Sequence, residues 1–374
     1  MLYRNFLGNN VSLLGFGAMR FPVQADKAGS PIDRPKSQVI IDRAIELGIN
    51  YFDTAYVYHG GESEPFLGEA LEKYPRQSYY LATKFFIGAN PDYKAVFEEQ
   101  LSRLRTDYID YYLIHNVNDG SIQSYLDSGC VDYFLEQKKA GRIRHLGFSN
   151  HGSMETLKTF LDRCPMDFCQ IQLNYFDWYL NQAKAEYDLL AERNIPVIIM
   201  EPVRGGKLAN LTPDAEKILK ALHPDWSSVA WAMRFLMDLD ATRTVLSGMS
   251  TLEQLEENAA LFSQSAPVGG AEQKALKEAA TLFLDQLKVP CTDCRYCCDD
   301  CPENINIPAY LAVLNTLKVD GNYLIHEKAD KVESKGKLSD CTECGSCAEH
   351  CPQDLKVPEL LKELAEAVEK SREE

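Results

Sequence analysis

A regular alternation of short apolar runs and longer helical patterns is the feature that most restricts the fold of this 374-residue chain. Each apolar run predicts a buried strand, and the segment after it carries apolar residues at helical spacing. The predicted strands cover residues 13–17, 49–53, 79–84, 109–115, 143–149, 169–173, 196–201 and 244–248. Strand–helix units repeated eight times in about 250 residues predict a (β/α)₈ TIM barrel of the α/β class.

A doubly wound parallel sheet is the alternative, because it also alternates strands with helices. Such a sheet usually carries a glycine-rich fingerprint after its first strand. Here the first strand ends in Gly15-Phe16-Gly17-Ala18-Met19-Arg20, which has no third glycine at the required spacing. The sequence therefore favours the barrel, and residues 3–11 are expected to form a hairpin that plugs its bottom.

Three segments are expected along the chain. Residues 1–265 form the barrel, in which Ser37 is predicted to cap the first helix and Gly48 to end it. Residues 266–288 form a linker and a helix, because residues 264–270 have linker composition and a helical pattern follows over 271–287. Residues 289–374 form a separate cysteine-rich domain.

Nine of the 12 cysteines lie after residue 290. Clustered cysteines in a chain without a secretory signal indicate metal binding rather than disulfides. Three thiolates on one tight loop can cap three irons of a cubane cluster, and a fourth must come from elsewhere. Two zinc sites are the alternative, since C-x₂-C pairs also bind zinc. The pattern C-x₂-C-x₂-C-x₃-C-P occurs twice, in Cys291, Cys294, Cys297 and Cys301 and in Cys341, Cys344, Cys347 and Cys351.

This pattern resembles that of bacterial two-cluster ferredoxins, in which the fourth cysteine of each run ligates the other cluster. The resemblance implies two [4Fe–4S] clusters, one held by Cys291, Cys294, Cys297 and Cys351 and one by Cys341, Cys344, Cys347 and Cys301. A long segment with helical spacing separates the runs, so a mainly helical ferredoxin-like domain is expected. The remaining cysteines are expected to be packing residues, namely Cys130, Cys164, Cys169 and Cys298.

Polar side chains stand at the ends of three successive predicted strands. Asp53 ends the second strand, and Tyr58 lies in the loop after it. Lys84 ends the third strand, and His115 ends the fourth. Barrel enzymes place their chemistry at the C-terminal ends of the strands. Each residue alone is more often a structural partner, but the four together predict a catalytic group.

The segments around these residues resemble the aldo-keto reductase family over roughly residues 1–265. The matching segments are Asp53-Thr54-Ala55-Tyr56-Val57-Tyr58, Ala82-Thr83-Lys84 and Tyr111-Tyr112-Leu113-Ile114-His115. The resemblance implies that Tyr58 is the proton donor of a carbonyl reduction and that Lys84, held by Asp53, lowers its pKa. His115 would orient the substrate oxygen, so that Tyr58 and His115 together polarise it.

The same resemblance implies a nicotinamide cofactor. NADP(H) is the family preference and NAD(H) the alternative, because no Arg or Lys stands where the 2′-phosphate is usually bound. Ser149, Asn150 and Gln172 would hold the carboxamide, and Met200 replaces a tyrosine that stacks on the nicotinamide in many members. The full implied set is Gly17, Met19, Asp53, Ser149, Asn150, Gln172, Met200, Glu201, Pro202, Val203, Gly205, Gly248, Met249, Ser250, Gln254 and Asn258.

The formal net charge of −16 argues against nucleic acid or an anionic membrane surface as a partner. No apolar run approaches the roughly 20 residues of a membrane span, and the first residues do not resemble a secretory signal. We therefore expect a cytoplasmic protein. Its expected partners are a small-molecule carbonyl substrate and an electron-transfer protein, without nucleic acid or membrane.

These features predict an iron–sulfur-containing oxidoreductase of aldo-keto reductase type. Nicotinamide transfers two electrons as a hydride, whereas each cluster carries one, so the role of the clusters stays open. They are structural or redox-sensing in an ordinary nicotinamide reductase, or they supply electrons in place of nicotinamide, directly or through a flavin. A third reading, a sensor or electron-transfer module without catalysis, is disfavoured by the complete tetrad. Aromatic residues in loops 85–87 and 174–178 suit an apolar carbonyl substrate.

Overall fold

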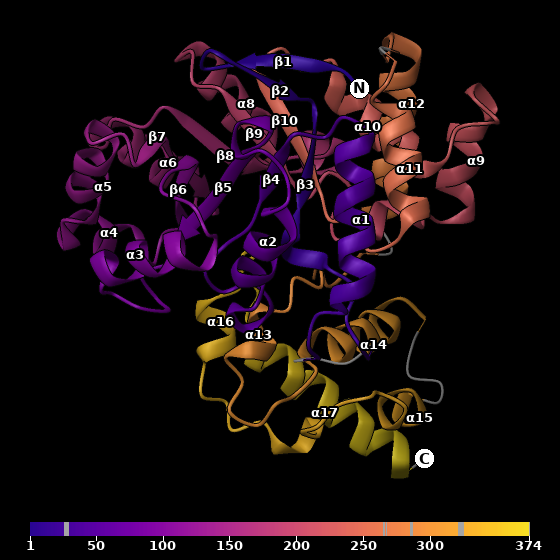
Figure 1. Cartoon of the computed structure of the whole chain (residues 1–374). Coiled ribbons are helices and arrows are strands. Elements are labelled where there is room, and N and C mark those ends of the chain that lie inside the picture. Colours follow the sequence, from indigo (N-terminus) through magenta and orange to yellow (C-terminus); the bar gives the residue numbers. More distant parts are fainter. Residues whose placement is uncertain (26–29, 265, 267, 285–286, 321–324, 374) are drawn as a thin grey trace.

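The computed structural model describes residues 1–25, 30–264, 266, 268–284, 287–320 and 325–373. Parts of the predicted linker (265 and 267) and of the predicted helix after it (285–286) lie outside the described residues. A barrel forms the larger part of the molecule, and a smaller helical domain lies against one end of it (Figure 1).

Eight parallel strands close into a barrel in the order β10-β3-β4-β5-β6-β7-β8-β9. Their side chains are mostly buried on both faces, as expected for strands covered by helices. All eight predicted strands are present, and the predicted (β/α)₈ fold is confirmed. The strands are β3 (Leu14–Gly17), β4 (Tyr51–Asp53), β5 (Tyr80–Phe85), β6 (Ile109–Val117), β7 (Ile143–Asn150), β8 (Phe168–Gln172), β9 (Val197–Met200) and β10 (Thr242–Ser247).

The predicted N-terminal hairpin is present as β1 (Tyr3–Phe6) and β2 (Asn9–Ser12), which pair antiparallel. Phe6 and Val11 are fully buried and join the inward-facing side chains of the barrel. The ring of Phe6 stacks on Tyr111 with centroids 4.4 Å apart. The hairpin therefore closes the N-terminal end of the barrel, which leaves the opposite end for the site.

Twelve helices described in the first 284 residues surround the strands or follow them. They are α1 (Arg34–Glu46), α2 (Ser63–Leu71), α3 (Tyr93–Arg103), α4 (Ile122–Ser128), α5 (Cys130–Lys139), α6 (Met154–Arg163), α7 (Tyr175–Leu180), α8 (Ala183–Glu192), α9 (Pro213–Leu222), α10 (Ser228–Met237), α11 (Leu252–Leu261) and α12 (Gly270–Leu284).

The helices differ from the predictions at four places, one of which is α7, where a loop was expected over residues 174–178. Asp33, not Ser37, caps α1 by accepting a hydrogen bond from the Lys36 amide, and Ser37 is buried inside the helix. The helix predicted over 122–140 is divided at Gly129, whose φ of +78° is the left-handed conformation that ends helices. Helix α9 was not predicted, although Thr212 caps it and a proline occupies its first turn.

The helix after the predicted linker belongs to the barrel. Helix α12 packs against α7 and α9, and its buried residues Leu276, Ala279 and Phe283 join the barrel core. The ring of Phe283 meets that of Phe176 edge-on at 5.9 Å. The structural boundary between the two parts of the chain therefore falls after α12.

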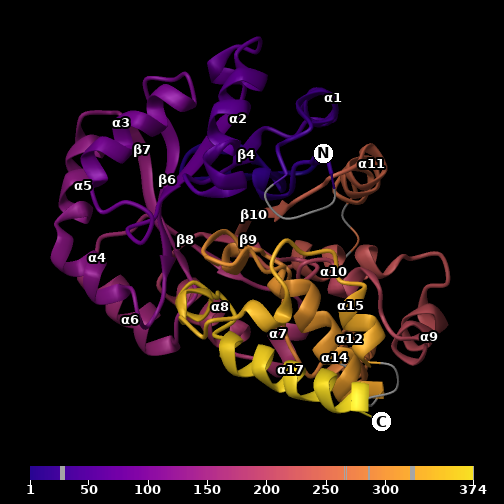
Figure 2. The ribbon, with the colours of Figure 1, turned by 90° about the horizontal axis from the view of Figure 1, so that it is seen from below.

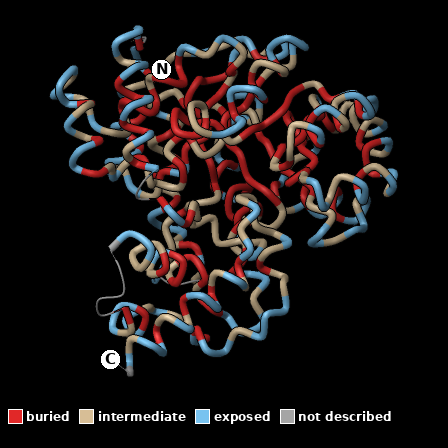
Figure 3. Tube along the Cα trace, turned by 180° about the vertical axis from the view of Figure 1, so that it is seen from behind, coloured by how far each residue is buried: buried red, intermediate tan, exposed pale blue. Residues whose placement is uncertain are grey.

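The C-terminal domain is mainly helical, as predicted, and has its own apolar core, which includes Ile305, Leu311, Leu314, Leu361 and Leu364. In Figure 2, seen from below, it lies in front of the barrel end, with α3 to α6 outside its outline. Figure 3 shows a buried interior in each part and an exposed rim around both. The helices are α13 (Tyr296–Asp299), α14 (Ile307–Asp320), α15 (Ile325–Asp330), α16 (Ser346–Glu349) and α17 (Val357–Glu373). Across the described ranges, no helix is long and apolar enough to span a membrane.

Candidate active site

Four side chains meet at the C-terminal end of the barrel. Asp53 is the last residue of β4, Lys84 lies in β5 and His115 lies in β6. Tyr58 follows β4 and begins a 3₁₀ turn (Tyr58–Gly61). All four are buried. The structure thus brings together the four residues that the sequence predicts to be catalytic.

The ammonium group of Lys84 holds this group together. Its Nζ donates hydrogen bonds to Asp53 Oδ1 (2.5 Å), to the carbonyl oxygen of Thr54 (2.7 Å) and to Tyr58 Oη (3.3 Å). An ammonium has three protons, so this set uses all of them. Because Tyr58 Oη already accepts from Lys84, its own proton can be donated toward the barrel mouth, where the Tyr296 hydroxyl lies.

Lys84 and Asp53 form a fully buried ion pair in which each charge stabilises the other. Burial lowers the pKa of Lys84, and the neighbouring Asp53 carboxylate opposes this shift. Burial likewise raises the pKa of Asp53, and Lys84 opposes it. Removing either partner would leave a buried charge without compensation, which is strongly destabilising.

The pKa of Tyr58 corrects one sequence prediction. It is raised well above 10, first by burial and then by the neighbouring Tyr296 and Asp53, whereas the sequence suggested that Lys84 would lower it. Removal of water disfavours the charged phenolate more than a single ammonium at 3.3 Å favours it. Tyr58 therefore stays protonated at neutral pH, which suits a proton donor.

His115 is a neutral imidazole. Burial and the positive charge of Lys84 lower its pKa well below 6.5. Its Nε2 lies 3.5 Å from the hydroxyl of Tyr296, a residue of the C-terminal domain. Its ring meets that of Tyr58 edge-on at 5.8 Å. Tyr58 and His115 thus present two polar atoms toward one point of the barrel mouth.

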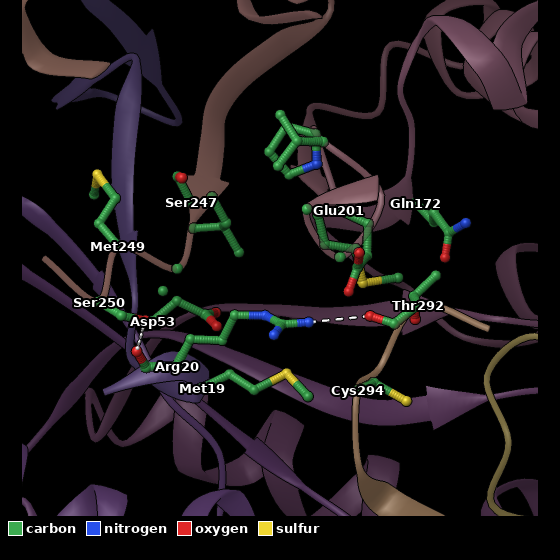
Figure 4. Close-up of a pocket in the computed structure, with 18 of the residues that line it drawn as sticks. Met19, Arg20, Asp53, Gln172, Glu201, Ser247, Met249, Ser250, Thr292 and Cys294 are labelled. Carbon is green, nitrogen blue, oxygen red and sulfur yellow. Dashed lines mark hydrogen bonds between the residues drawn. The ribbon is translucent and has the colours of Figure 1, made fainter. Parts of the chain in front are cut away.

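A cavity of about 320 Å³ begins at these residues. That volume is within the usual range of ligand pockets. The cavity extends from Tyr58 and His115 to the loops after β9 and β10. Figure 4 shows side chains from these two loops, among them Glu201 and Met249, at the cavity. Fourteen of the sixteen predicted cofactor residues line it, namely Gly17, Met19, Asp53, Gln172, Met200, Glu201, Pro202, Val203, Gly205, Gly248, Met249, Ser250, Gln254 and Asn258.

The two other predicted cofactor residues are engaged elsewhere. The hydroxyl of Ser149 accepts a hydrogen bond from the Asn116 amide (2.8 Å), and Asn150 Nδ2 faces the carbonyl oxygen of Gly152 (3.4 Å). Neither side chain is among the described residues that line the cavity. Ser149 thus connects β7 to β6, and Asn150 Nδ2 contacts the loop after β7, while its Oδ1 has no partner among the described residues.

Gln170 is a cavity residue that the sequence reasoning missed. Its Oε1 is buried and has no partner among the described residues, and its Nε2 faces the sulfur of Met200 at 3.3 Å. Residues two apart in a strand share a face. Gln170 therefore shares the inward face of β8 with Gln172, and this alternation could have identified it. His151 also lines the cavity.

The C-terminal domain forms one wall of this cavity. Arg20 Nη2 donates to the carbonyl oxygens of Thr292 (3.1 Å) and Asp293 (3.2 Å), and Figure 4 shows Arg20 extended toward Thr292. Glu201 faces the same space with a pKa raised by burial, and Arg20 opposes that shift. Cys294 of the first cysteine run also lines the cavity.

Two further contacts fix the C-terminal domain to the barrel. Gly205 has a φ of +63°, and a Cβ there would lie 1.9 Å from the carbonyl oxygen of Thr292. The backbones of the two domains therefore touch at this point. Gln353 Nε2 donates to Gln172 Oε1 at 2.7 Å, so the side chain predicted to hold a carboxamide is bound to the C-terminal domain.

A second cavity of about 330 Å³ lies on the other side of His115 and Tyr296, both of which also line the first cavity. Its walls combine barrel loops, including Tyr56 and Phe86, with His350 of the C-terminal domain. The ring of Phe86 meets those of His115 and His350 edge-on at 5.7 and 5.6 Å. This aromatic chamber is the candidate substrate side of the site.

The eight cysteines of the two runs surround two small cavities within the C-terminal domain. Burial raises the pKa of Cys291 and of Cys347 to about 11, so these thiols need a metal to be ionised at neutral pH. The donor sets are those implied by the sequence, Cys291, Cys294, Cys297 and Cys351 around one cavity and Cys301, Cys341, Cys344 and Cys347 around the other. All-thiolate sets of four suit iron–sulfur clusters.

Comparison with known families matches both parts of the chain. Residues 13–267 match the aldo/keto reductase family, and residues 290–355 match the 4Fe-4S dicluster domain. Both predicted resemblances are thereby confirmed.

Curated relatives and solved structures agree with these matches. The oxidoreductase YqkF of Bacillus subtilis is 29% identical over 67% of this chain and 86% of its own. The L-galactose dehydrogenase of Arabidopsis thaliana is 27% identical over 74% of this chain and 92% of its own. The structure of the aldo-keto reductase AKR11C1 from Bacillus halodurans (holo form) is 29% identical, covers 73% of this chain and 93% of its own, and superposes with a TM-score of 0.61.

Proposed function

Because this chain belongs to the aldo/keto reductase family and carries a C-terminal 4Fe-4S dicluster domain, we propose that it reduces small carbonyl compounds with NADP(H), using Tyr58 as general acid. One observation carries the proposal. Lys84 donates to Asp53, Thr54 and Tyr58, which leaves the Tyr58 proton for a ligand beside His115. The reverse reaction would use Tyr58 as the base.

The first cavity would hold the dinucleotide. It extends without interruption from Tyr58 to the loop after β10, where Gly248 and Gln254 would face the adenosine half. The unpartnered Oε1 of Gln170 would accept from the carboxamide, and Arg20 would face the diphosphate. When bound, NADP(H) supplies a hydride, which is two electrons, to the carbonyl carbon.

The tetrad would carry the proton and orient the substrate. The substrate oxygen would accept hydrogen bonds from Tyr58 Oη and His115 Nε2, which present one polarising site. Tyr58 would then transfer its proton to that oxygen, and the Lys84 ammonium, 3.3 Å from Tyr58 Oη, would stabilise the resulting phenolate. The docked C-terminal domain would exclude water from this step.

The two cysteine sets would hold [4Fe–4S] clusters, which exchange one electron each. Their thiols must stay reduced to bind iron, which suits the cytoplasmic location expected from the sequence. Cys344 of the second set is exposed. We infer that an electron-transfer protein would meet the domain at this side.

A second candidate function is reduction with electrons from the clusters in place of nicotinamide. It is favoured by Thr292, Cys294 and Gln353, which line both the first cluster cavity and the barrel cavity. Conversion of a carbonyl to an alcohol takes two electrons and two protons, and two clusters carry two electrons between them. Electrons from the first cluster would then pass to the substrate through the wall that Cys294 forms between the two cavities.

The proposal is tested with Tyr58→Phe in cluster-replete protein. Loss of the general acid should reduce turnover of small aldehydes by roughly 10²- to 10⁴-fold, while NADPH binding, followed by fluorescence, and iron content stay unchanged. Tyr310→Phe is the matched control, because Tyr310 lies in the core of the C-terminal domain. Turnover that survives in Tyr58→Phe would contradict the proposal.

The two electron sources are separated by anaerobic titration with NADPH and, separately, NADH, followed by visible absorbance and electron paramagnetic resonance. If the nucleotide binds while the clusters stay oxidised, the nicotinamide reductase is supported. Reduction of the clusters by either nucleotide would instead show that electrons pass between the barrel and the C-terminal domain. A mediator such as a flavin should then be sought in the protein.

A further inference from the structure

The two cysteine loops differ at one position that matters for the barrel. Tyr296 stands between Cys294 and Cys297, and Ser346 stands at the matching position between Cys344 and Cys347. The second loop has the same cysteine spacing with a serine at this position, so the spacing does not itself require a tyrosine. The tyrosine of the first loop extends into the barrel mouth and lines both of its cavities.

The hydroxyl of Tyr296 occupies the point where a substrate oxygen would bind. It lies 3.5 Å from His115 Nε2, and it also contacts Tyr58, whose ring is 6.4 Å away at an interplanar angle of 30°. These are the two groups that would polarise a carbonyl. A substrate oxygen that accepts from both Tyr58 and His115 would take the place of the Tyr296 hydroxyl.

Tyr296 is tied to the first cysteine set through its backbone. Its amide N–H donates to the sulfur of Cys294. The preceding loop is held against the barrel by Arg20, which donates to Thr292 and Asp293. Hydrogen bonds to cysteine sulfurs are among the factors that set the potential of an iron–sulfur cluster. A displacement of Tyr296 therefore changes a bond that a cluster in this set would sense.

We propose that Tyr296 is an internal competitor for the substrate oxygen, and that its displacement couples occupancy of the barrel site to the first cluster. This inference rests on one part of the proposed function, namely that a substrate oxygen binds at Tyr58 and His115. It does not depend on whether nicotinamide or the clusters supply the electrons. Coupling between two sites is reciprocal. The oxidation state of the first cluster therefore changes the affinity of the barrel site for substrate.

The test uses full-length, cluster-replete protein and acetate, whose carboxylate oxygen competes for the same two groups. Acetate affinity is measured by calorimetry in wild type, Tyr296→Phe and Tyr310→Phe. The Tyr296 variant should bind acetate roughly five- to tenfold more tightly, because one competing hydrogen bond is lost. The Tyr310 control should match wild type.

The second readout needs no variant. Anaerobic redox titration of the wild type, followed by electron paramagnetic resonance, should show that acetate shifts the midpoint potential of one cluster and leaves the other unchanged. Sodium chloride of equal ionic strength should shift neither. In Tyr296→Phe the acetate-dependent shift should be reduced, because the side chain no longer needs to move.

Unchanged acetate affinity in Tyr296→Phe, or unchanged cluster potentials in the wild type with acetate, would each overturn the inference. Neither measurement involves turnover. Failure of the proposed carbonyl reduction would appear instead as activity retained in Tyr58→Phe, so the two failures are distinguishable.

Discussion

The two cysteine loops have the same backbone and different surroundings. Left-handed residues occur at matching positions, Asp293 with Glu343 and Arg295 with Gly345. The first loop is packed against the barrel, with Thr292 buried and Tyr296 beside His115. The second loop faces outward, and its Cys344 is exposed. Cysteine spacing thus specifies what a loop can bind, whereas the residues between the cysteines and the docking surface specify what the bound group can reach.

The largest expected effect comes from forcing the first loop away from the barrel. Gly205→Ala would place a Cβ 1.9 Å from the Thr292 carbonyl oxygen, so the loop must shift. We expect a loss of about 3 kcal/mol in unfolding free energy, as for other backbone clashes and strained positions. Hydrogen exchange at residues 291–297 should increase.

Gly206→Ala is the matched control for this change. Gly206 is also left-handed, with a φ of +88°, and no described atom lies within 4 Å of the added Cβ. It should cost only the conformational strain of about 1–2 kcal/mol, with exchange at 291–297 unchanged. Equal effects of the two substitutions would show that the first loop does not depend on this contact.

The next effect compares one cysteine from each loop. Cys294 lines the barrel cavity, whereas Cys344 does not appear among its described lining residues. Cys294→Ala should change the NADP(H) dissociation constant by roughly tenfold, the size of one lost polar or packing contact. Cys344→Ala should leave it within about twofold, although iron content falls in both. Calorimetry of the purified variants measures this, and equal dissociation constants would remove the distinction between the loops.

A smaller effect is expected at the residue that follows each Cys-Pro pair. Gln353, after Cys351-Pro352, donates to Gln172 of the barrel at 2.7 Å. Glu303 occupies the same position after Cys301-Pro302 and is exposed. Gln353→Ala should reduce unfolding free energy by about 1 kcal/mol, and Glu303→Ala by less than about 0.5 kcal/mol. Thermal or denaturant unfolding measures both losses. A larger loss for Glu303→Ala would contradict the view that Gln353, and not Glu303, helps to fix the C-terminal domain to the barrel.

The smallest expected effect is that of pH on the rate of carbonyl reduction. The first loop helps to bury Tyr58 and His115, and burial moves the pKa values of both residues away from neutral pH. The pKa of Tyr58 is raised above 10, and that of His115 is lowered well below 6.5. Tyr58 gives up its proton only as the pH rises through its raised pKa, and His115 gains one only at acid pH. The rate of the chemical step should therefore vary by less than about twofold between pH 7 and 9. A steep fall within this range, in single-turnover measurements, would contradict these pKa directions.

Local patterns were enough to predict most of the fold and the residues at the barrel end. The strands are apolar runs bounded by turn residues, and the tetrad stands at strand ends, where a parallel barrel brings side chains together. Helix α9 was missed although Thr212 and the proline after it mark its start. The cap at Asp33 was missed because Ser37, four residues later, is also a residue type that caps helices. Gln170 was missed in favour of Gln172, although both lie on one face of β8, because the choice depends on which side chain Gln353 and Asp177 bind.

The sequence by itself determined the barrel, the two cysteine runs and the polar residues at the strand ends, because each depends on the residue type and its spacing along the chain. The exchange of the fourth cysteine between the two sets and the roles within the tetrad came from the resemblance to known families. Only the tertiary structure decided that Tyr296 lies beside His115, that Gly205 meets Thr292 and that burial raises the pKa of Tyr58. These features arise where residues more than eighty positions apart exclude water together. Desolvation and close packing are properties of such contacts, and no local pattern records them.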